Sequence, residues 1–172
     1  MKFTRPILFA SPVKDLTIAR YLAAIEVDYI GIDLDQSDLK KLQAFINQLI
    51  EWIEGPKLIG VTAYPLQMQH LELGLHGFYA DSDLSILNDR IRMHSLNYYN
   101  KYKPNQIDYI LLNQNETSIS QIPCLLQSSI KQYPKPNEFI SGYLFSPGNE
   151  DKTGLFDFDE LDAWIEQVKG LA

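Results

Sequence analysis

Short apolar runs that alternate with segments of helical periodicity are the feature that most restricts the fold of this chain. A run that is apolar throughout, such as Ile7-Leu8-Phe9-Ala10, is typical of a strand covered on both faces. Strands that alternate with helices favour parallel pairing with right-handed crossovers. The sequence therefore predicts an α/β fold with mostly parallel strands. The predicted strands are residues 7–10, 28–34, 57–64, 77–80, 108–112, 123–126 and 139–145.

The segments between these runs carry apolar residues at the spacing of a helix face. Helices are predicted over residues 15–25, 39–53, 65–73 and 84–102. Near the C-terminus, Asp157 and Glu160 have the spacing of a capping box, which predicts a last helix there. No internal repeat or low-complexity tract divides the chain, so residues 1–172 are expected to form a single domain.

Two arrangements fit this order of elements, a closed barrel and an open doubly wound sheet. A G-x-G-x-x-G phosphate loop does not follow the first strand, where the sequence is Ser11-Pro12-Val13-Lys14-Asp15. Its absence favours a (β/α) barrel of the TIM type. Such barrels usually need about 200 residues or more, and the chain has 172. We therefore expect a shortened or incomplete barrel, with one or two β/α units reduced or missing from the seven predicted strands.

Composition restricts the partners and the compartment. A net charge of −7 repels the phosphate backbone of nucleic acids, so nucleic-acid binding is not expected. The single cysteine, Cys124, excludes an intrachain disulfide and suits a reducing compartment. No stretch approaches the ~20 apolar residues of a membrane span, and the first residues do not have the pattern of a signal peptide. The sequence predicts a cytoplasmic protein that does not bind membranes.

Two segments resemble phosphoribosylanthranilate isomerase, the barrel enzyme of tryptophan biosynthesis. Residues 28–32, Asp-Tyr-Ile-Gly-Ile, match the family's second-strand sequence, at the family's spacing from Ser11-Pro12. Ser141-Gly142 stands where the family's last strand begins a Ser-Gly-Val-Glu motif, and residues 153–161 resemble the loop and helix that follow. A weaker match is residues 108–113, which are similar to the family's Asp-x-Val-Gln-Leu-His strand. The resemblance implies the same barrel fold.

The departures from the family pattern concern catalysis. The resemblance implies a general base at the position of Ser11, where the family has cysteine, and an aspartate on a later strand as the general acid. A serine hydroxyl is far less acidic than a thiol and cannot act as a base without an activator. We expect the strand that carries the acid to be missing. The glycine-rich phosphate loop is absent, Leu144 replaces the motif's glutamate, and residues 35–38 (Asp-Gln-Ser-Asp) replace the family's basic loop. The original isomerase activity is expected to be lost.

The candidate site lies where the strands end, because active sites of these barrels form at the carboxyl ends of the strands. Ser11 is the candidate catalytic residue, and we expect the ligand to be a small phosphorylated sugar. A backbone N–H group at Ser141-Gly142 could hold its phosphate. Two alternatives are a helix N-cap role for Ser11 and a tight strand end at Ser141-Gly142. The candidate ligand-binding residues are Asp33, Asn113, Ser141 and Gly142.

Two other functions remain open from the sequence. A metal-dependent enzyme could use Asp33, Asp35 and Asp81, because hard cations prefer oxygen ligands, but no calcium-loop motif is present and we assign no metal and no cofactor. A non-catalytic scaffold or interaction protein is the second alternative, since a fold alone does not guarantee chemistry. A group of tyrosines could seal a homodimer interface, although helix packing explains them equally well: Tyr98, Tyr99, Tyr102, Tyr109 and Tyr133. The three histidines, His70, His76 and His94, lack the spacing of metal ligands and are expected to be surface or helix residues.

Overall fold

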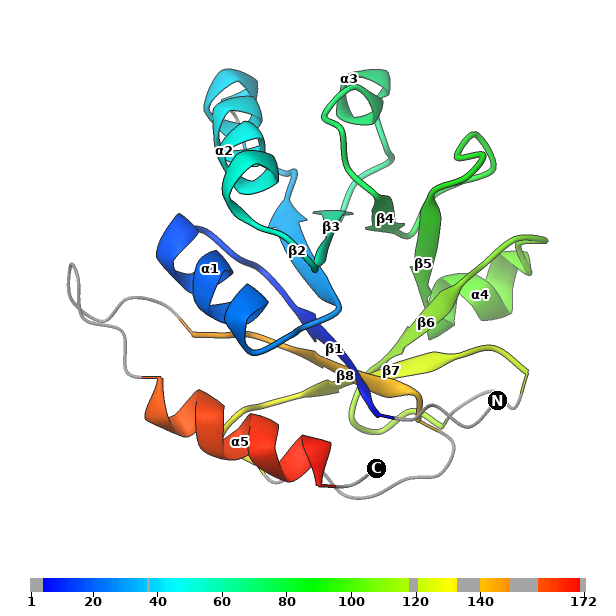
Figure 1. Ribbon diagram of the computed structural model, residues 1–172. Helices are drawn as coiled ribbons and strands as arrows, with labels where there is room; N and C mark the ends of the chain where they lie inside the picture. The colour runs from blue at the N-terminus through cyan, green and yellow to red at the C-terminus, as the bar shows by residue number, and fades with distance from the viewer. Residues whose placement is uncertain (1–4, 37, 118–120, 133–139, 149–157, 171–172) are drawn as a thin grey trace.

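Eight parallel strands close into a barrel in the computed structural model of this protein (Figure 1). The structure describes residues 5–36, 38–117, 121–132, 140–148 and 158–170. Each strand pairs with the next along the chain, and the last pairs with the first. The predicted TIM-type barrel is therefore confirmed. The strands are β1 (Ile7–Ala10), β2 (Tyr29–Asp33), β3 (Lys57–Thr62), β4 (Gly77–Ala80), β5 (Ile91–Ser95), β6 (Tyr109–Leu112), β7 (Cys124–Ser128) and β8 (Gly142–Phe145).

The strand that was not predicted from the sequence is β5, which falls inside the helix predicted over residues 84–102. That prediction is wrong for residues 84–95, because the helical spacing of Leu84, Leu87 and Ile91 is accidental. Residues 81–90 form turns and bends, and β5 pairs with β4 and β6. The helix that follows, α4 (Leu96–Tyr102), has only seven residues. All strands of the barrel are thus present, and the expectation of a missing strand is corrected.

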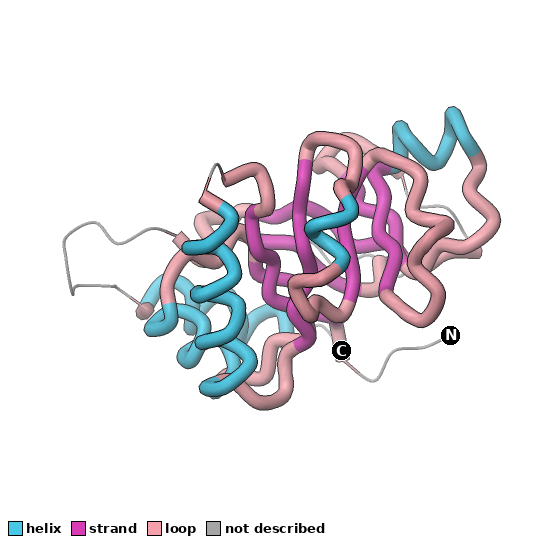
Figure 2. The backbone as a smooth tube through the Cα atoms, turned by 90° about the horizontal axis from the view of Figure 1, so that it is seen from above, coloured by secondary structure: helices cyan, strands magenta, loops and turns pink. Residues whose placement is uncertain are grey.

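The shortening of the barrel lies in its helical layer. The long helices α1 (Leu16–Ala24), α2 (Leu39–Trp52) and α5 (Asp159–Lys169) pack on one side of the ring of strands (Figures 1 and 2). Elsewhere the layer contains α4 and the four-residue α3 (Met68–Leu71), which is shorter than the helix predicted over residues 65–73. Within the described ranges, no helix is long and apolar enough to cross a membrane. Asp157, the predicted cap of the last helix, lies outside the described residues.

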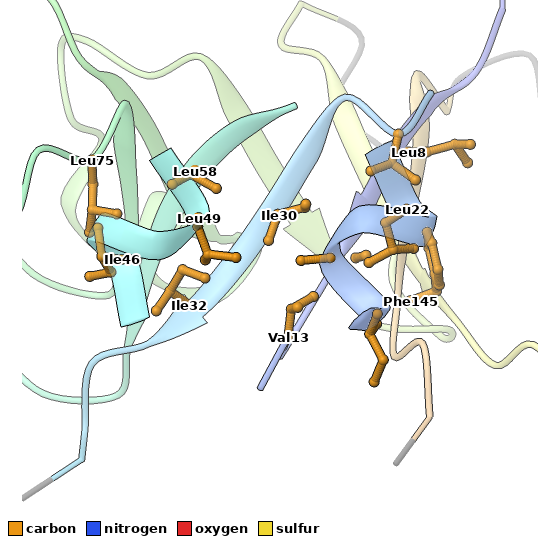
Figure 3. Packing of buried hydrophobic residues seen from close by; sticks show 14 of the residues in the cluster. Leu8, Val13, Leu22, Ile30, Ile32, Ile46, Leu49, Leu58, Leu75 and Phe145 are labelled. Carbon is orange, nitrogen blue, oxygen red and sulfur yellow. The ribbon is translucent and has the colours of Figure 1, made fainter. Parts of the chain in front are cut away.

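The larger core lies between the strands and the long helices. Figure 3 shows Leu22 of α1 beside Leu8, and Leu49 of α2 near Ile30 and Leu58. All of these side chains are at most 3% exposed. On the other side of α1, Trp164 of α5 packs against Tyr143 and Phe145 of β8, with ring centroids 6.0 and 4.9 Å apart. This core anchors β8, β1, β2 and β3 to the helical layer.

The barrel interior is filled in layers, as in other closed barrels of this type. One layer comes from the even-numbered strands and consists of Tyr29, Gly77, Tyr109 and Gly142, which pair in register with Phe9, Ile59, Met93 and Leu125. The two tyrosines lie on opposite strands, β2 and β6, and their hydroxyl oxygens are 3.0 Å apart. The two glycines lie against the neighbouring strands, Gly77 against Ile91 of β5 and Gly142 against Ile7 of β1. A Cβ atom on Gly142 would lie 2.1 Å from the carbonyl oxygen of Ile7.

A repeated hydrogen bond lies at the amino end of the barrel. The residue just before β2, β4 or β6 accepts, through its side chain, the backbone N–H of the second residue of the preceding strand. Asp28 accepts from Leu8 (2.8 Å), His76 from Leu58 (3.1 Å) and Asp108 from Arg92 (2.8 Å). The backbone N–H of each of these three acceptors donates in return to the carbonyl oxygen of the same partner. The pattern ties each even-numbered strand to the odd-numbered one before it.

Candidate functional site

A pocket of about 810 Å³ opens at the carboxyl ends of the strands. Its walls come mostly from the segments that follow β1, β6, β7 and β8. Its floor is made of side chains of the barrel interior, among them Phe9, Val61, Tyr79 and Leu144. The polar side chains that line it are Ser11, Asn113, Gln114, Asn115, Gln127, Ser128, Ser129, Lys131 and Ser146. We call this cavity the mouth pocket.

Ser11, the candidate catalytic residue, lies directly after β1 and lines the mouth pocket. Its side chain fills the space above a glycine of the neighbouring strand, since a Cβ atom on Gly31 would lie 2.3 Å from Ser11 Oγ. The alternative role as a helix cap is wrong, because Asp15 caps α1 by accepting the N–H of Ile18 at 2.8 Å. Ser11 is therefore available as a pocket residue.

Asn113 follows β6 and lines the same pocket as Ser11. The two residues are far apart in the sequence, and closure of the ring of strands brings them together. Its backbone N–H donates to Glu116 Oε2 at 2.6 Å, and the N–H of Glu116 donates back to the carbonyl oxygen of Asn113 at 3.0 Å. This tight turn fixes the backbone of Asn113 while its amide side chain borders the cavity. The structure thus brings two of the predicted site residues together.

The segments after β7 and β8 supply pocket residues that the sequence analysis did not single out. Ser128 is the last residue of β7, Ser129 and Lys131 follow it, and Ser146 follows β8. Loops after the seventh and eighth strands of such barrels frequently form a phosphate site. Lys131 is the only cationic side chain among the described residues that line the mouth pocket. The available signal was the Ser-Ser-x-Lys sequence of residues 128–131, shortly after the strand predicted over residues 123–126.

Ser141 and Gly142, by contrast, lie at the amino end of β8, opposite the mouth pocket. Placing Ser141 on the rim with Ser11 was therefore wrong, because β8 begins at Gly142 and Ser141 comes before it. Ser141 occupies the position before β8 that Asp28 occupies before β2, and its backbone N–H already donates to the carbonyl oxygen of Cys124 at 2.8 Å. The geometry agrees with the alternative interpretation, a tight strand end that requires glycine.

The aspartates of the rim do not line the mouth pocket, and their side chains bind nearby polar groups. Asp33 accepts the N–H of Asp35 at 2.9 Å, and Asp35 accepts from the Thr62 hydroxyl at 2.5 Å and the Ala63 N–H at 2.8 Å. Asp81 accepts from both the N–H and the hydroxyl of Ser95. In the part of the chain that the structure describes, no three His, Cys, Asp or Glu side chains form a group that could hold a metal ion.

The mouth pocket offers hydrogen bonds and one positive charge, but little capacity for proton transfer. Among the described residues that line it there is no aspartate, glutamate, histidine or cysteine. Its tyrosine, Tyr79, stays a neutral phenol at neutral pH, because burial, with smaller contributions from Asp81 and Glu116, raises its pKa to about 12. An effective general acid or base has a pKa near the working pH. The pocket is suited to binding a polar molecule.

Comparison with known proteins supports the fold. No protein-family model and no curated protein matches the chain. Among solved structures, the chain is similar to N-(5'-phosphoribosyl)anthranilate isomerase from Pyrococcus furiosus, with a TM-score of 0.69 and 14% sequence identity. The alignment covers 96% of this chain and 100% of that chain. At this identity the likeness shows the fold alone, and it confirms the resemblance in fold that the sequence predicted.

Proposed function

From the barrel fold shared with phosphoribosylanthranilate isomerase, we propose that this protein binds a small phosphorylated sugar in the mouth pocket without catalysing that enzyme's isomerisation. One observation carries the proposal. The described lining of the pocket combines hydroxyl and amide groups with a single cation, and it contains no carboxylate, imidazole or thiol. Such a lining can hold a phosphate and a polyol, but it lacks the usual groups that move protons.

Lys131 and the serines of the β7 and β8 loops are the proposed phosphate-binding groups. An ammonium group supplies three N–H donors and a positive charge, and the hydroxyls of Ser128, Ser129 and Ser146 can each donate a hydrogen bond. Their position after the seventh and eighth strands supports this role. The amides of Asn113 and Gln127 are suited to the hydroxyl groups of a sugar, because an amide both donates and accepts.

Loss of catalysis follows from side chains and not from a missing part of the barrel. The aminoaldose-to-ketose reaction implied by the resemblance needs a general acid and a general base. Ser11 and Asn113 border the pocket, but neither a serine hydroxyl nor an amide titrates near neutral pH. Glu116, in the loop after β6, is not among the lining residues and accepts the backbone N–H of Asn113. These features support a binding function.

A non-catalytic scaffold is the second candidate, and the open outer surface of the barrel favours it. Large apolar side chains outside the mouth pocket are exposed, including Trp52 (58%) and Met68 (74%). A scaffold would recognise its partner through such surfaces and would leave the mouth pocket without a specific ligand. The metal-dependent alternative has less support, since Asp33, Asp35 and Asp81 already accept hydrogen bonds within the protein.

The proposal is tested by titrating the protein with ribose 5-phosphate, ribose and inorganic phosphate, with binding followed by protein NMR. We expect saturable binding of ribose 5-phosphate that is tighter than that of either fragment. Lys131→Gln should weaken it roughly tenfold, because a charge-assisted hydrogen bond is lost. Lys14→Gln, at an exposed position outside the pocket, is the matched control and should leave binding unchanged. Absence of saturable binding would favour the scaffold.

A further inference from the structure

A second pocket, of about 380 Å³, lies outside the barrel, between the β4–β5 connection and the segment of α4 and its following loop. Residues 81–90 make this connection with turns and bends, so no helix covers the outer face of β5 there. Its lining includes Asp83 and Ser85 on one side and Lys103 and Asn105 on the other. We call it the lateral pocket. It shares no lining residue with the mouth pocket.

Three neighbouring rings, His94, Tyr98 and Tyr102, form an aromatic wall of the lateral pocket. His94, at the end of β5, stacks on Tyr98 with ring centroids 4.7 Å apart and an angle of 14° between the planes. Tyr98 in turn contacts Tyr102, with centroids 4.6 Å apart. The rings run from the buried His94, 1% exposed, to Tyr102, which is 57% exposed. The wall therefore leads from the surface into the protein.

The inner ring has a hydrogen-bonding atom without a partner. Nδ1 of His94 lies 2.7 Å from the carbonyl oxygen of Ala80, and since a carbonyl only accepts, Nδ1 carries the hydrogen. Burial lowers the pKa of His94, which keeps the ring neutral. Nε2 therefore has a lone pair, and among the described residues it has no hydrogen-bond partner although it is buried. Such an orphaned acceptor is rare in native proteins and needs an explanation.

We propose that the lateral pocket binds a small, planar, uncharged molecule that donates an N–H or O–H hydrogen bond to His94 Nε2. The aromatic wall of His94, Tyr98 and Tyr102 suits a flat ring, because aromatic groups pack face to face with an offset or edge to face. The lining contains one carboxylate, Asp83, and one ammonium, Lys103, so neither an anion nor a cation is favoured. The volume lies within the range of small-molecule sites.

The donor requirement is tested with two rings of similar shape, phenol and toluene, of which only phenol has a donor. The chain has three histidines, so histidine-ring ¹H–¹⁵N spectra are simple, and His70 and His76 act as internal controls. We expect phenol to shift the His94 Nε2 resonance saturably without shifting the other two rings. Toluene should bind roughly tenfold more weakly, as expected for loss of one hydrogen bond. Equal binding of the two probes would overturn the proposal.

Two variants separate the donor contact from the aromatic wall. His94→Phe keeps an aromatic ring and removes the acceptor, so the preference for phenol over toluene should disappear. Tyr102→Ala truncates an exposed ring, which leaves the fold intact, and should weaken binding of both probes by several-fold. Ile50→Ala, at an exposed position of α2 away from the pocket, is the control and should change neither. A phenol preference that persists in His94→Phe, or no saturable shift of His94, would also contradict the proposal.

Discussion

Single glycines set how closely neighbouring strands and side chains approach in this barrel. Gly142 lies against the backbone of β1, and Gly77 lies against Ile91 of β5. Gly31 instead leaves room for the side chain of Ser11. The distinction matters because a side chain can move aside, whereas two paired backbones cannot. Glycine at position 142 is thus required by packing, although the sequence analysis assigned it to ligand binding.

Gly142→Ala is expected to destabilise the protein by about 3 kcal/mol, within the range for overpacking a well-packed core. The added Cβ atom would lie 2.1 Å from the carbonyl oxygen of Ile7, which forces β1 and β8 apart. Gly170→Ala is the matched control, because its Cβ would meet nothing closer than 3.4 Å, and it should change stability by less than about 0.5 kcal/mol. Urea unfolding measures both. Equal stability of the two variants would show that the strands can separate at no cost.

The three histidines make stability depend on pH in a predictable direction. Burial lowers the pKa of His70, His76 and His94, so each ring takes up a proton more readily in the unfolded chain than in the folded protein. The unfolded state then binds more protons as the pH falls below about 6.5. We expect the free energy of unfolding to decrease between about pH 7 and pH 5. In His94→Phe this decrease should be smaller, and urea unfolding of both proteins across that range provides the comparison. An identical pH dependence would contradict the assignment for His94.

At the scale of the elements, alternation of strands and helices could be read from the sequence, but two boundaries could not. Strand β5 was not predicted because three of its five residues, Arg92, His94 and Ser95, are polar, and because its apolar Ile91 continued a helical spacing by chance. Strand β8 begins at Gly142, so Ser141 lies at the amino end of the barrel and not on the rim where it was predicted. In both cases tertiary pairing decided the structure, and local periodicity carried no information about it.

At the amino end of the barrel, side chains just before the even-numbered strands accept backbone N–H groups of the preceding strands. Asp28 accepts the N–H of the fully buried Leu8, and it also forms an ion pair with Arg5 in which both side chains are partly exposed, by 27% and 42%. An exposed ion pair contributes less than about 1 kcal/mol, whereas leaving a buried N–H without an acceptor costs about 1–3 kcal/mol. The hydrogen bond to Leu8 should therefore dominate.

The variants Asp28→Ala and Arg5→Ala test whether the hydrogen bond to Leu8 contributes more to stability than the ion pair with Arg5. Asp28→Ala is expected to lower the free energy of unfolding by about 2 kcal/mol, and Arg5→Ala by less than about 1 kcal/mol. Asp28→Asn, which keeps an acceptor oxygen, should fall between them. Thermal or urea unfolding in low and high salt gives the comparison. If Arg5→Ala cost as much as Asp28→Ala, the ion pair would be the main contribution.

For the whole molecule, closure of the ring is what creates the site. Ser11 and Asn113 could be predicted as neighbours because the carboxyl ends of all strands meet at one opening. The role of Lys131 could not be predicted, because it depends on how the segment after β7 folds over that opening. The rim aspartates were predicted as ligands, but hydrogen bonds within their own loops and to neighbouring strands occupy them, which residue type alone does not indicate. Barrel closure thus explains the part of the site that could be predicted, and the folding and hydrogen bonds of the individual loops explain the rest.

The mouth pocket is proposed to bind a phosphorylated sugar without isomerising it. The most direct test of this proposal is ¹H NMR of N-(5'-phosphoribosyl)anthranilate mixed with the protein. We expect the ligand's ribose signals to broaden in proportion to added protein and Lys131→Gln to reduce the broadening. We expect no ketose signals that grow faster than in a protein-free sample. Ketose signals that grow in proportion to protein concentration would contradict the proposal, since the mouth pocket would then contain working proton-transfer groups.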